Sequence, residues 1–403
     1  MIQLFKTSRM WRSHALASSY DVVIIGGGVH GLATAYYLGK LGVRNVAILE
    51  KGYIGSGASG RNTAIIRSNY RTFEGVNFYD ESVKLYEQLS QELRYNVLFS
   101  QQGHLTLAHT DSAIVGLRVR AEVNQLAGVE SRVIWPDEIK QMVPAMDCSS
   151  RPRYPVLAAL YHAPGGIVRH DAVVWGYARG ADRMGIAIHP FTEVTGIGRT
   201  NGRVTSVQTT RGEIRTGTVV NSTAGFCSTI AALAGIRLPI VTHPLQAFVT
   251  EPLKPFLHKV LVSANLHVYV SQTDRGECVI GSEIDPYASY SYRSTLPFLE
   301  NTAHYTLELF PCLKHVRVLR QWAGICDMTP DYSPIMGEVP EVKGLILDVG
   351  WGTYGFKAGP VSGKRIAELI ATGRTPDLIQ PFSITRFGDD RLVGEKAAAA
   401  VSH

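Results

Sequence analysis

Residues 22–31 read VVIIGGGVHG, and this stretch decides the fold. Four consecutive apolar residues predict a buried β-strand, and Gly26, Gly28 and Gly31 have the GxGxxG spacing of a dinucleotide-binding turn. Gly26 permits the tight turn, Gly28 lets the backbone approach a pyrophosphate, and Gly31 lets the next helix pack closely against the strand. We therefore predict a dinucleotide site here; the alternative is a glycine-rich turn that binds no ligand.

The residues after the turn complete a βαβ unit. Apolar side chains at helical spacing between residues 32 and 38 predict a helix, and residues 46–49 (VAIL) predict a second strand. Glu50 follows that strand about 20 residues beyond the turn, where an acidic side chain accepts hydrogen bonds from ribose hydroxyls. The N-terminus of the helix then faces the phosphates of the same ligand.

Later segments favour FAD over NAD. An NAD-dependent dehydrogenase would continue with further βαβ units, whereas short strands near residues 186–204 are accompanied by the hairpin signals Asn201-Gly202 and Arg211-Gly212. A small-residue turn, NSTAG, lies at residues 221–225, and a further glycine-rich turn, GWGTYGFK, lies at residues 350–357 between a predicted strand and helix. A third loop that approaches the same ligand suits the isoalloxazine ring of a flavin, so we predict FAD.

Length and composition exclude several classes of protein. The 403 residues suit two interleaved domains, and the scattered net charge of +6 predicts no nucleic-acid-binding face. Apolar stretches are short and broken by glycine, so no membrane span is expected. Five dispersed cysteines without CxxC spacing argue against a zinc site or a disulfide framework and fit a reducing cytoplasm. Residues 1–20 are basic and lack an apolar core, so we expect an arm rather than a signal peptide.

The fold class predicted from this order of elements is α/β with α+β elements. We expect an FAD-binding dinucleotide domain of the glutathione-reductase type, interleaved with a sheet-rich domain that holds the substrate. The predicted segments are residues 1–20 for the N-terminal arm, 21–75, 166–235 and 326–385 for the FAD-binding domain, 76–165 and 236–325 for the substrate domain, and 386–403 for the C-terminal tail.

Further motifs point to a family. They are GRNT at residues 60–63, IIRSNY at 65–70, RHD at 169–171, QWAG at 321–324 and TPD at 329–331, in addition to the turns at 26–31 and 350–357. In this order they resemble the D-amino-acid-oxidase-like flavoenzymes and, within them, the beta subunits of heterotetrameric sarcosine oxidases. The resemblance covers almost the whole length, including FSI at residues 382–384 and the terminal AVSH.

The resemblance implies FAD that is held without a covalent bond. Monomeric relatives tether FAD through a cysteine at the position of Gly324, and Cys326 lies out of register; they also activate oxygen with a lysine where this sequence has Val279. The residues expected to bind FAD are Gly26, Gly28, Val29, His30, Gly31, Glu50, Lys51, Arg61, Asn62, Thr63, Val194, Ala224, Gly225, Gly352, Gly355 and Lys357.

The activity that the resemblance implies is flavin-dependent oxidation of sarcosine to glycine and formaldehyde. A hydride passes to FAD, and electrons then pass to a covalent FMN and to O2. The implied partners are an alpha subunit with NAD-binding and tetrahydrofolate functions and small gamma and delta subunits. The alternatives are a related secondary-amine or L-proline dehydrogenase subunit and a non-catalytic FAD-binding subunit.

The covalent FMN is expected at His170. In that family the FMN is attached through its 8α-methyl group to a histidine, which the RHD motif places at this residue. The pattern over residues 171–184 predicts a helix with Asp171 as its N-cap. The positive end of the helix dipole disfavours protonation of an imidazole just before a helix N-terminus. One ring nitrogen of that imidazole is then free to act as a nucleophile. The alternative is a surface histidine near a helix cap.

Arg67 and Lys357 are expected to hold the substrate. Arginine binds a carboxylate through two parallel hydrogen bonds, and lysine adds a point charge. Residues in similar Ile-Ile-Arg and Gly-Phe-Lys contexts have this role in monomeric sarcosine oxidases. The alternatives are a structural ion pair or a flavin-phosphate contact for Arg67 and a flavin-carbonyl contact for Lys357. His267 and Tyr269 are expected either to line the substrate pocket or to pack within a sheet.

Overall fold

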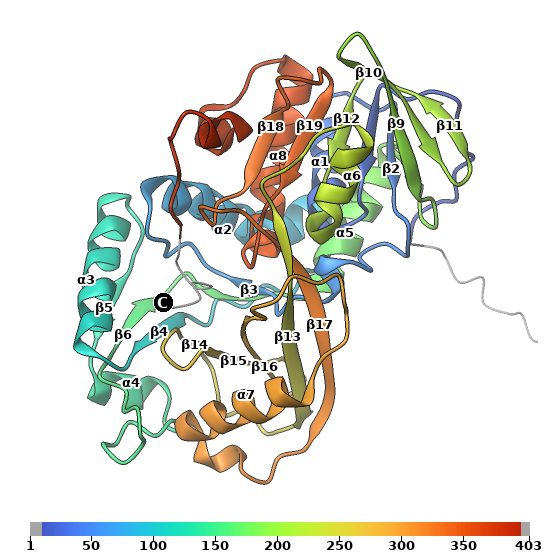
Figure 1. Cartoon of the computed structure of the whole chain (residues 1–403). Helices are drawn as coiled ribbons and strands as arrows, with labels where there is room; N and C mark the ends of the chain where they lie inside the picture. Colours follow the sequence, from blue (N-terminus) through green and yellow to red (C-terminus); the bar gives the residue numbers. More distant parts are fainter. Residues whose placement is uncertain (1–9, 396–403) are drawn as a thin grey trace, which may run out of the picture.

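The computed structural model describes residues 10–395 of the chain (Figure 1). Two large sheets organise these residues, one in the upper and one in the lower part of the view in Figure 1, and the long strands β13 (Val241–Pro252) and β17 (Val318–Met328) extend between the two parts. The first nine residues of the predicted arm and the terminal AVSH lie outside the described residues.

The predicted apolar strand lies in the middle of the first sheet. The order of strands is β18-β19-β12-β1-β2-β8, and all neighbours are parallel except β18 and β19. The strands are β1 (Val22–Ile25), β2 (Val46–Leu49), β8 (Ala187–His189), β12 (Val219–Asn221), β18 (Ile335–Glu338) and β19 (Leu345–Val349).

Both faces of the first sheet are covered, which explains why β1 is apolar throughout. Val22 and Ile24 pack in the same core as four helices, whereas Val23 and Ile25 pack in a second core with a three-stranded sheet and a short helix. The four helices are α1 (Val29–Lys40), α2 (Phe73–Leu93), α5 (His170–Arg183) and α8 (Gly355–Thr372). The second layer contains β9 (Val194–Thr200), β10 (Arg203–Thr209), β11 (Gly212–Arg215) and α6 (Cys227–Leu233).

The second sheet has the order β17-β13-β16-β15-β14-β4-β6-β5, with parallel pairing only between β14 and β4 among its described strands. Its remaining strands are β4 (His104–Ala108), β5 (Arg132–Ile134), β6 (Ala158–His162), β14 (Val260–Ser263), β15 (Val268–Gln272) and β16 (Glu277–Ile284). The other elements are β3 (Ile65–Ile66), which pairs with β7 (Gly166–Ile167), and the helices α2 (Phe73–Leu93), α3 (Asp111–Leu126), α4 (Pro136–Met142) and α7 (Leu296–Leu309).

The predicted fold class is confirmed: a mostly parallel sheet with covering helices is combined with a mostly antiparallel sheet. The domain boundaries stay a prediction, and β17 crosses one of them between residues 325 and 326. Within residues 10–395, no helix combines the length and the apolar character that crossing a membrane requires.

A buried ion pair holds residues near the end of the described chain against the TPD motif. The side chain of Arg386 donates to the two carboxylate oxygens of Asp331 over 2.7 and 2.9 Å, and the two side chains are only 2% and 1% exposed. The same carboxylate accepts a hydrogen bond from the backbone N–H of Val393. Both oxygens of Asp331 are therefore satisfied by the segment that contains Arg386.

Changing Arg386 to Met should leave the carboxylate of Asp331 buried without its counter-charge. We expect the free energy of unfolding to fall by about 3 to 5 kcal/mol, the cost of removing one partner of a buried pair. The measurement is thermal unfolding of the purified variant. Arg374→Met is the matched control, since that side chain is exposed, and an equal Tm for the two variants would contradict the assignment.

Candidate active site

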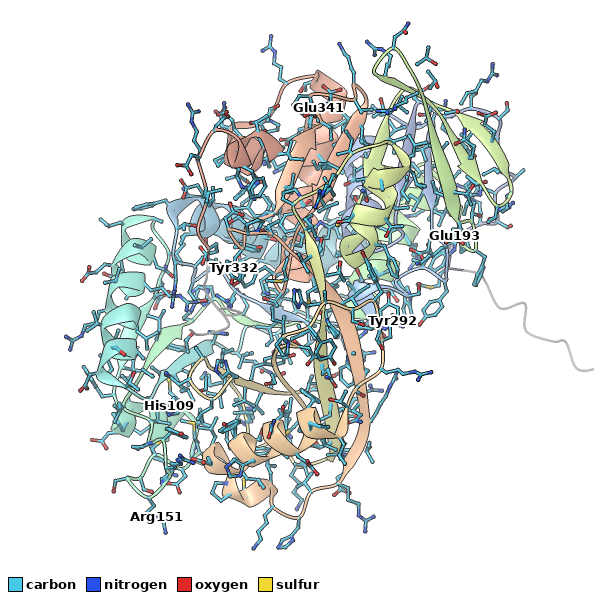
Figure 2. All side chains as sticks on the ribbon, viewed as in Figure 1. His109, Arg151, Glu193, Tyr292, Tyr332 and Glu341 are labelled. Atoms are coloured by element: carbon cyan, nitrogen blue, oxygen red, sulfur yellow. The ribbon has the colours of Figure 1, made fainter. Side chains whose placement is uncertain are left out.

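A cavity of about 680 Å³ lies where the carboxyl ends of β1, β2 and β12 face the second sheet. Val262, Tyr269 and Ser282 from β14, β15 and β16 line the side that belongs to the second sheet. Figure 2 labels two further lining residues, Glu193 beside β9 and Tyr292 between the two parts of the molecule. Open parallel sheets bind ligands at this edge, so the cavity is the candidate ligand site.

The glycine-rich turn brings α1 close to the ends of β1 and β12. Gly26 has a φ of +115°, and a Cβ there would overlap the carbonyl oxygen of Ser222. A Cβ on Gly31 would overlap the carbonyl oxygen of Gly26, and one on Gly28 would lie 2.9 Å from Ser59 Oγ. The absence of side chains at these three positions therefore allows the N-terminus of α1 to reach the cavity.

An acidic and a basic side chain lie at the end of β2. The carboxylate of Glu50 accepts hydrogen bonds from the backbone N–H groups of Gly27 (2.9 Å) and Gly52 (2.8 Å), so it links the glycine-rich turn to the loop after β2. Lys51 Nζ lies 3.3 Å from the centre of the Phe226 ring. Glu50, Lys51 and Phe226 all line the cavity.

The loop after β2 forms another part of the wall. The guanidinium group of Arg61 donates to the carbonyl oxygen of Gly57 over 3.2 Å, and its central carbon lies 4.0 Å from the centre of the Tyr292 ring. The side-chain oxygen of Asn62 accepts a hydrogen bond of 2.6 Å from the backbone N–H of Ala64. These contacts hold the loop against the cavity and place a cation beside it.

Two buried cations lie at the end of the cavity next to the second sheet. Arg67 is 3% exposed and donates to the backbone oxygen (3.1 Å) and the side-chain oxygen (3.0 Å) of Asn69, while Lys357 is 8% exposed and its Nζ lies 3.5 Å from the carbonyl oxygen of Thr353. Neither cation forms an ion pair with any residue whose side chain the structure describes. Buried charges without partners favour binding of an anion.

Burial and the nearby charge of Arg67 hold the pKa of Lys357 well below its ordinary value. A bound carboxylate would offset both effects, because an opposite charge favours the charged form of the ammonium group. Tyr269 lines the same part of the cavity, and burial raises the pKa of its hydroxyl group, which stays protonated. With a carboxylate bound, this end of the cavity therefore offers two cations and a hydroxyl group.

Comparison with known proteins agrees with this geometry. The family model described as FAD dependent oxidoreductase (DAO) matches residues 21–369. The chain belongs to this family. It is 46% identical to sarcosine oxidase subunit beta of Rhodobacter capsulatus over 98% of this chain and 95% of the relative, and 45% identical to that of an Arthrobacter species over 98% and 97%. The solved structure of an L-proline dehydrogenase from P. horikoshii superimposes with a TM-score of 0.89 at 31% identity, covering 94% of this chain and all of that one.

The predicted resemblance to D-amino-acid-oxidase-like enzymes and sarcosine oxidase beta subunits is confirmed, and the described residues fit the family's FAD. The lining includes Glu50 after β2, Val194 at the start of β9, and Tyr269 and Lys357. The N-terminus of α1 suits a pyrophosphate and Glu50 suits ribose hydroxyls. No cluster of residues in the described part of the chain is arranged to hold a metal ion.

Most of the residues predicted for FAD and substrate line the cavity. These are Gly26, Gly28, Val29, His30, Glu50, Lys51, Arg61, Asn62, Thr63, Arg67, Val194, Ala224, Tyr269, Gly352, Gly355 and Lys357. Gly31 and Gly225 do not line the cavity. A Cβ on Gly225 would lie 2.5 Å from Ile325 Cγ1. His267 lies in the turn between β14 and β15 with a φ of +50° and does not line the cavity. Gly324 and Cys326 line it, but Val279 does not.

His170 is partly buried in the first turn of α5 and lies outside this lining. The prediction that Asp171 caps the helix is wrong, because the helix begins one residue earlier and Arg169 is the N-cap. The carboxylate of Asp171 instead pairs with Arg169 over 2.8 Å and accepts a hydrogen bond from the N–H of Ala172. Burial lowers the pKa of His170, which favours a neutral imidazole.

Sequence reasoning missed Asp327, which lines the cavity next to Trp351. Burial raises the pKa of Asp327 to about 6, even though its carboxylate accepts a hydrogen bond from the N–H of Gly350 over 2.6 Å. Asp327 lies between the QWAG and TPD motifs, and this position could have indicated that it belongs to the site. An acid that titrates near neutral pH beside a ligand cavity is a candidate functional group.

Replacing Gly28 with Val should abolish flavin retention. The new side chain would contact Ser59 and fill space at the cavity wall where the family's cofactor lies. The measurement is the flavin absorbance per polypeptide after purification. Gly116→Val is the matched control, because that glycine is exposed on α3 and a Cβ there has open space. A full flavin spectrum in Gly28→Val would mean that the cofactor lies elsewhere.

Proposed function

We propose that the chain oxidises sarcosine (N-methylglycine) to glycine and formaldehyde as the beta subunit of a hetero-oligomer. The observation that carries the proposal is the buried pair Arg67 and Lys357, which lines the FAD cavity and has no carboxylate partner among the side chains that the structure describes. It is supported by the 46% identity to sarcosine oxidase subunit beta of Rhodobacter capsulatus. A non-catalytic FAD-binding subunit has no need of a buried site for a carboxylate.

Arg67 and Lys357 bind the carboxylate of the amino acid and thereby orient its amine. Arg67 is already held by Asn69, so little side-chain freedom is lost when the substrate binds. The same two positive charges lower the pKa of a bound secondary ammonium group, because a like charge disfavours the charged form. The substrate is therefore presented as the neutral amine, from which a hydride leaves more readily.

The reaction removes two electrons and two protons from the substrate. The N-methyl carbon loses a hydride, for which bound FAD supplies the acceptor, and the resulting iminium ion adds water. The carbon–nitrogen bond of this water adduct then breaks to release formaldehyde and glycine. With O2 as the final acceptor, sarcosine, water and O2 give glycine, formaldehyde and hydrogen peroxide. Residues of this chain hold the substrate and exclude bulk water from the buried end of the cavity.

L-Proline is the second candidate substrate. It is also a secondary amine with one carboxylate, so the same pair of cations would hold it. The observation in its favour is the solved L-proline dehydrogenase of P. horikoshii, which is 31% identical and superimposes along the whole of its chain. The two candidates differ in the bulk next to the amine, which the residues around Tyr269 must accommodate.

A second flavin, FMN, completes the proposal, with a covalent bond to a ring nitrogen of His170. Support comes from the lowered pKa of this residue and from its position in the first turn of α5, apart from the FAD cavity. Bound there, FMN would supply a second electron carrier between FAD and O2. The proposed partners are an alpha subunit with NAD-binding and tetrahydrofolate functions and small gamma and delta subunits. A cytoplasmic location is proposed because the five cysteines are free.

Changing Arg67 or Lys357 to Met should lower kcat/KM for sarcosine by at least about tenfold, on the order of 1.4 kcal/mol of lost transition-state binding. Steady-state assays of the assembled complex with sarcosine and with L-proline measure the effect and separate the two substrates. The matched controls are Arg374→Met and Lys343→Met, both at exposed positions. Unchanged kinetics in both cavity variants would remove the carboxylate-binding role, and higher turnover on L-proline would replace sarcosine as the substrate.

In the assembled complex, His170→Asn should lose the covalent flavin and most oxidase turnover while it retains FAD that sarcosine still reduces. The reason is that asparagine has no nucleophilic ring nitrogen to form the bond. Mass spectrometry of a tryptic digest should show the wild-type peptide with His170 heavier by one FMN. His304→Asn, an exposed position on α7, is the control. A covalent flavin that persists in His170→Asn would assign the attachment to another residue.

A further inference from the structure

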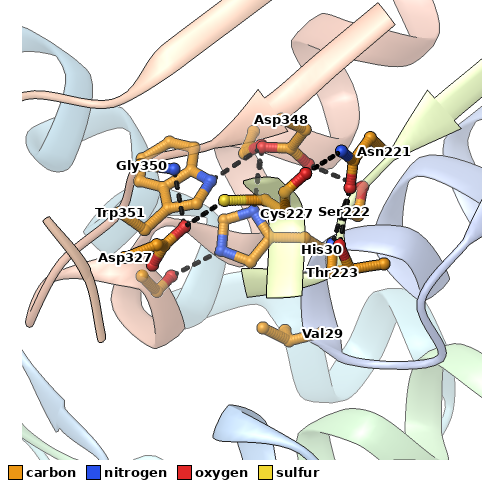
Figure 3. A network of polar contacts seen from close by, with 12 residues as sticks. Val29, His30, Asn221, Ser222, Thr223, Cys227, Asp327, Asp348, Gly350 and Trp351 are labelled. Carbon is orange, nitrogen blue, oxygen red and sulfur yellow. Dashed lines mark hydrogen bonds and ion pairs between the residues drawn. The ribbon is translucent and has the colours of Figure 1, made fainter. Parts of the chain in front are cut away.

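A buried polar network surrounds His30, the second residue of α1 and part of the cavity lining (Figure 3). Its ring lies between Asp348 of β19 and the first turns of α8, which contain Gly355 and Ser362. The glycine-rich turn and the turn at residues 350–357 therefore meet at this imidazole.

The contacts determine which ring nitrogens carry hydrogen. Nε2 of His30 lies 2.7 Å from the carbonyl oxygen of Gly355, which only accepts, so Nε2 is an N–H donor. Nδ1 lies 3.2 Å from Asp348 Oδ1 and 3.1 Å from Ser362 Oγ. The hydroxyl of Ser362 donates its hydrogen to Asp348 Oδ1 over 2.6 Å. Nδ1 therefore also faces two acceptors, and both nitrogens must carry hydrogen.

The surroundings of Asp348 require the same assignment. Its carboxylate, which is buried, accepts hydrogen bonds from Trp351 Nε1 (2.9 Å), Ser362 Oγ (2.6 Å) and Ser222 Oγ (3.3 Å). All of these partners are neutral donors, so none of them supplies a positive charge to this carboxylate. The imidazolium of His30 is its counter-ion.

Electrostatics agrees with this geometry. Burial lowers the pKa of His30, but the charge and hydrogen bond of Asp348, together with the carbonyl of Gly355, outweigh burial and raise it. Asp327 of β17 adds a smaller effect in the same direction. Since the pKa of Asp327 is raised to about 6, its negative charge is present at neutral pH. The two acids thus favour the charged form of His30.

We propose that His30 is a permanently charged imidazolium in the wall of the flavin cavity and makes the bound FAD a stronger oxidant. A hydride brings one negative charge to the cofactor, and a fixed cation nearby in a buried environment stabilises that charge. His30 is a positioning residue, because it acts through its charge and exchanges no proton with the substrate. The inference rests on FAD in this cavity and not on which amine is oxidised.

The redox potential of FAD tests the proposal without any amine substrate. In the full chain loaded with FAD, His30→Gln should lower the ratio of reduced to oxidised FAD at a fixed potential by at least about tenfold. This ratio corresponds to a fall of about 30 mV in the midpoint potential of a two-electron couple. The measurement is reduction by dithionite in the presence of a reference dye, after flavin content has been determined. His304→Gln is the matched control at an exposed site. A potential equal to that of the control would overturn the role in tuning FAD.

The charge of His30 is tested separately by the 15N chemical shifts of histidine rings in the wild-type holoprotein. His30→Gln identifies the signals, and both nitrogens should remain protonated from about pH 6 to pH 8. An unprotonated nitrogen at neutral pH would overturn the proposal. If His30→Gln retains no flavin, His30→Asn provides the potential instead, with the same fall expected. Asp348→Asn tests the pairing: without its counter-ion, His30 should lose the hydrogen of one ring nitrogen at neutral pH, and two protonated nitrogens there would overturn the proposed ion pair.

Discussion

The close approach of Gly31 to the carbonyl oxygen of Gly26 is the constraint on which the rest of the structure depends. It fixes the angle at which α1 leaves β1, and this angle brings the N-terminus of α1 to the edge of the sheet. Because β1 lies in the middle of the sheet, the same contact places the ends of β2 and β12 on either side of the cavity. The second sheet then needs only to close the opposite side.

The cavity separates two kinds of charge. Near the first sheet, Glu50 is held by backbone N–H groups and His30 by Asp348, so each of these side chains already has partners within the chain. At the second sheet, Arg67 and Lys357 are buried without an ion-pair partner among the described side chains. The charged groups at the cofactor end therefore have partners within the chain. The cations at the far end are available to bind an anion that enters and leaves.

The sequence could predict those features of the fold and the site whose contacts join residues close together along the chain. The turn, its helix and Glu50 belong to one short unit, and both the strand pattern and the family were recognisable. The network around His30 was missed, because Asp348 and Ser362 lie 318 and 332 residues away along the chain. His267 and Tyr269 are separated by one residue, yet a turn at His267 gives them different surroundings, which alternation alone did not reveal. The N-cap was misplaced by two residues, since the carboxylate of Asp171 is engaged by Arg169.

The long sequence separation within the first sheet also governs when the protein can take up its cofactor. During synthesis the VVIIGGGVHG stretch emerges early, but its partner β12 ends at Asn221, and the turn that meets His30 follows β19, which ends at Val349. At the usual speed of about 5 to 20 residues per second, this interval lasts on the order of tens of seconds. An apolar strand without its neighbour is prone to aggregate throughout that time. Flavin loading is therefore a late event in the life of the nascent chain.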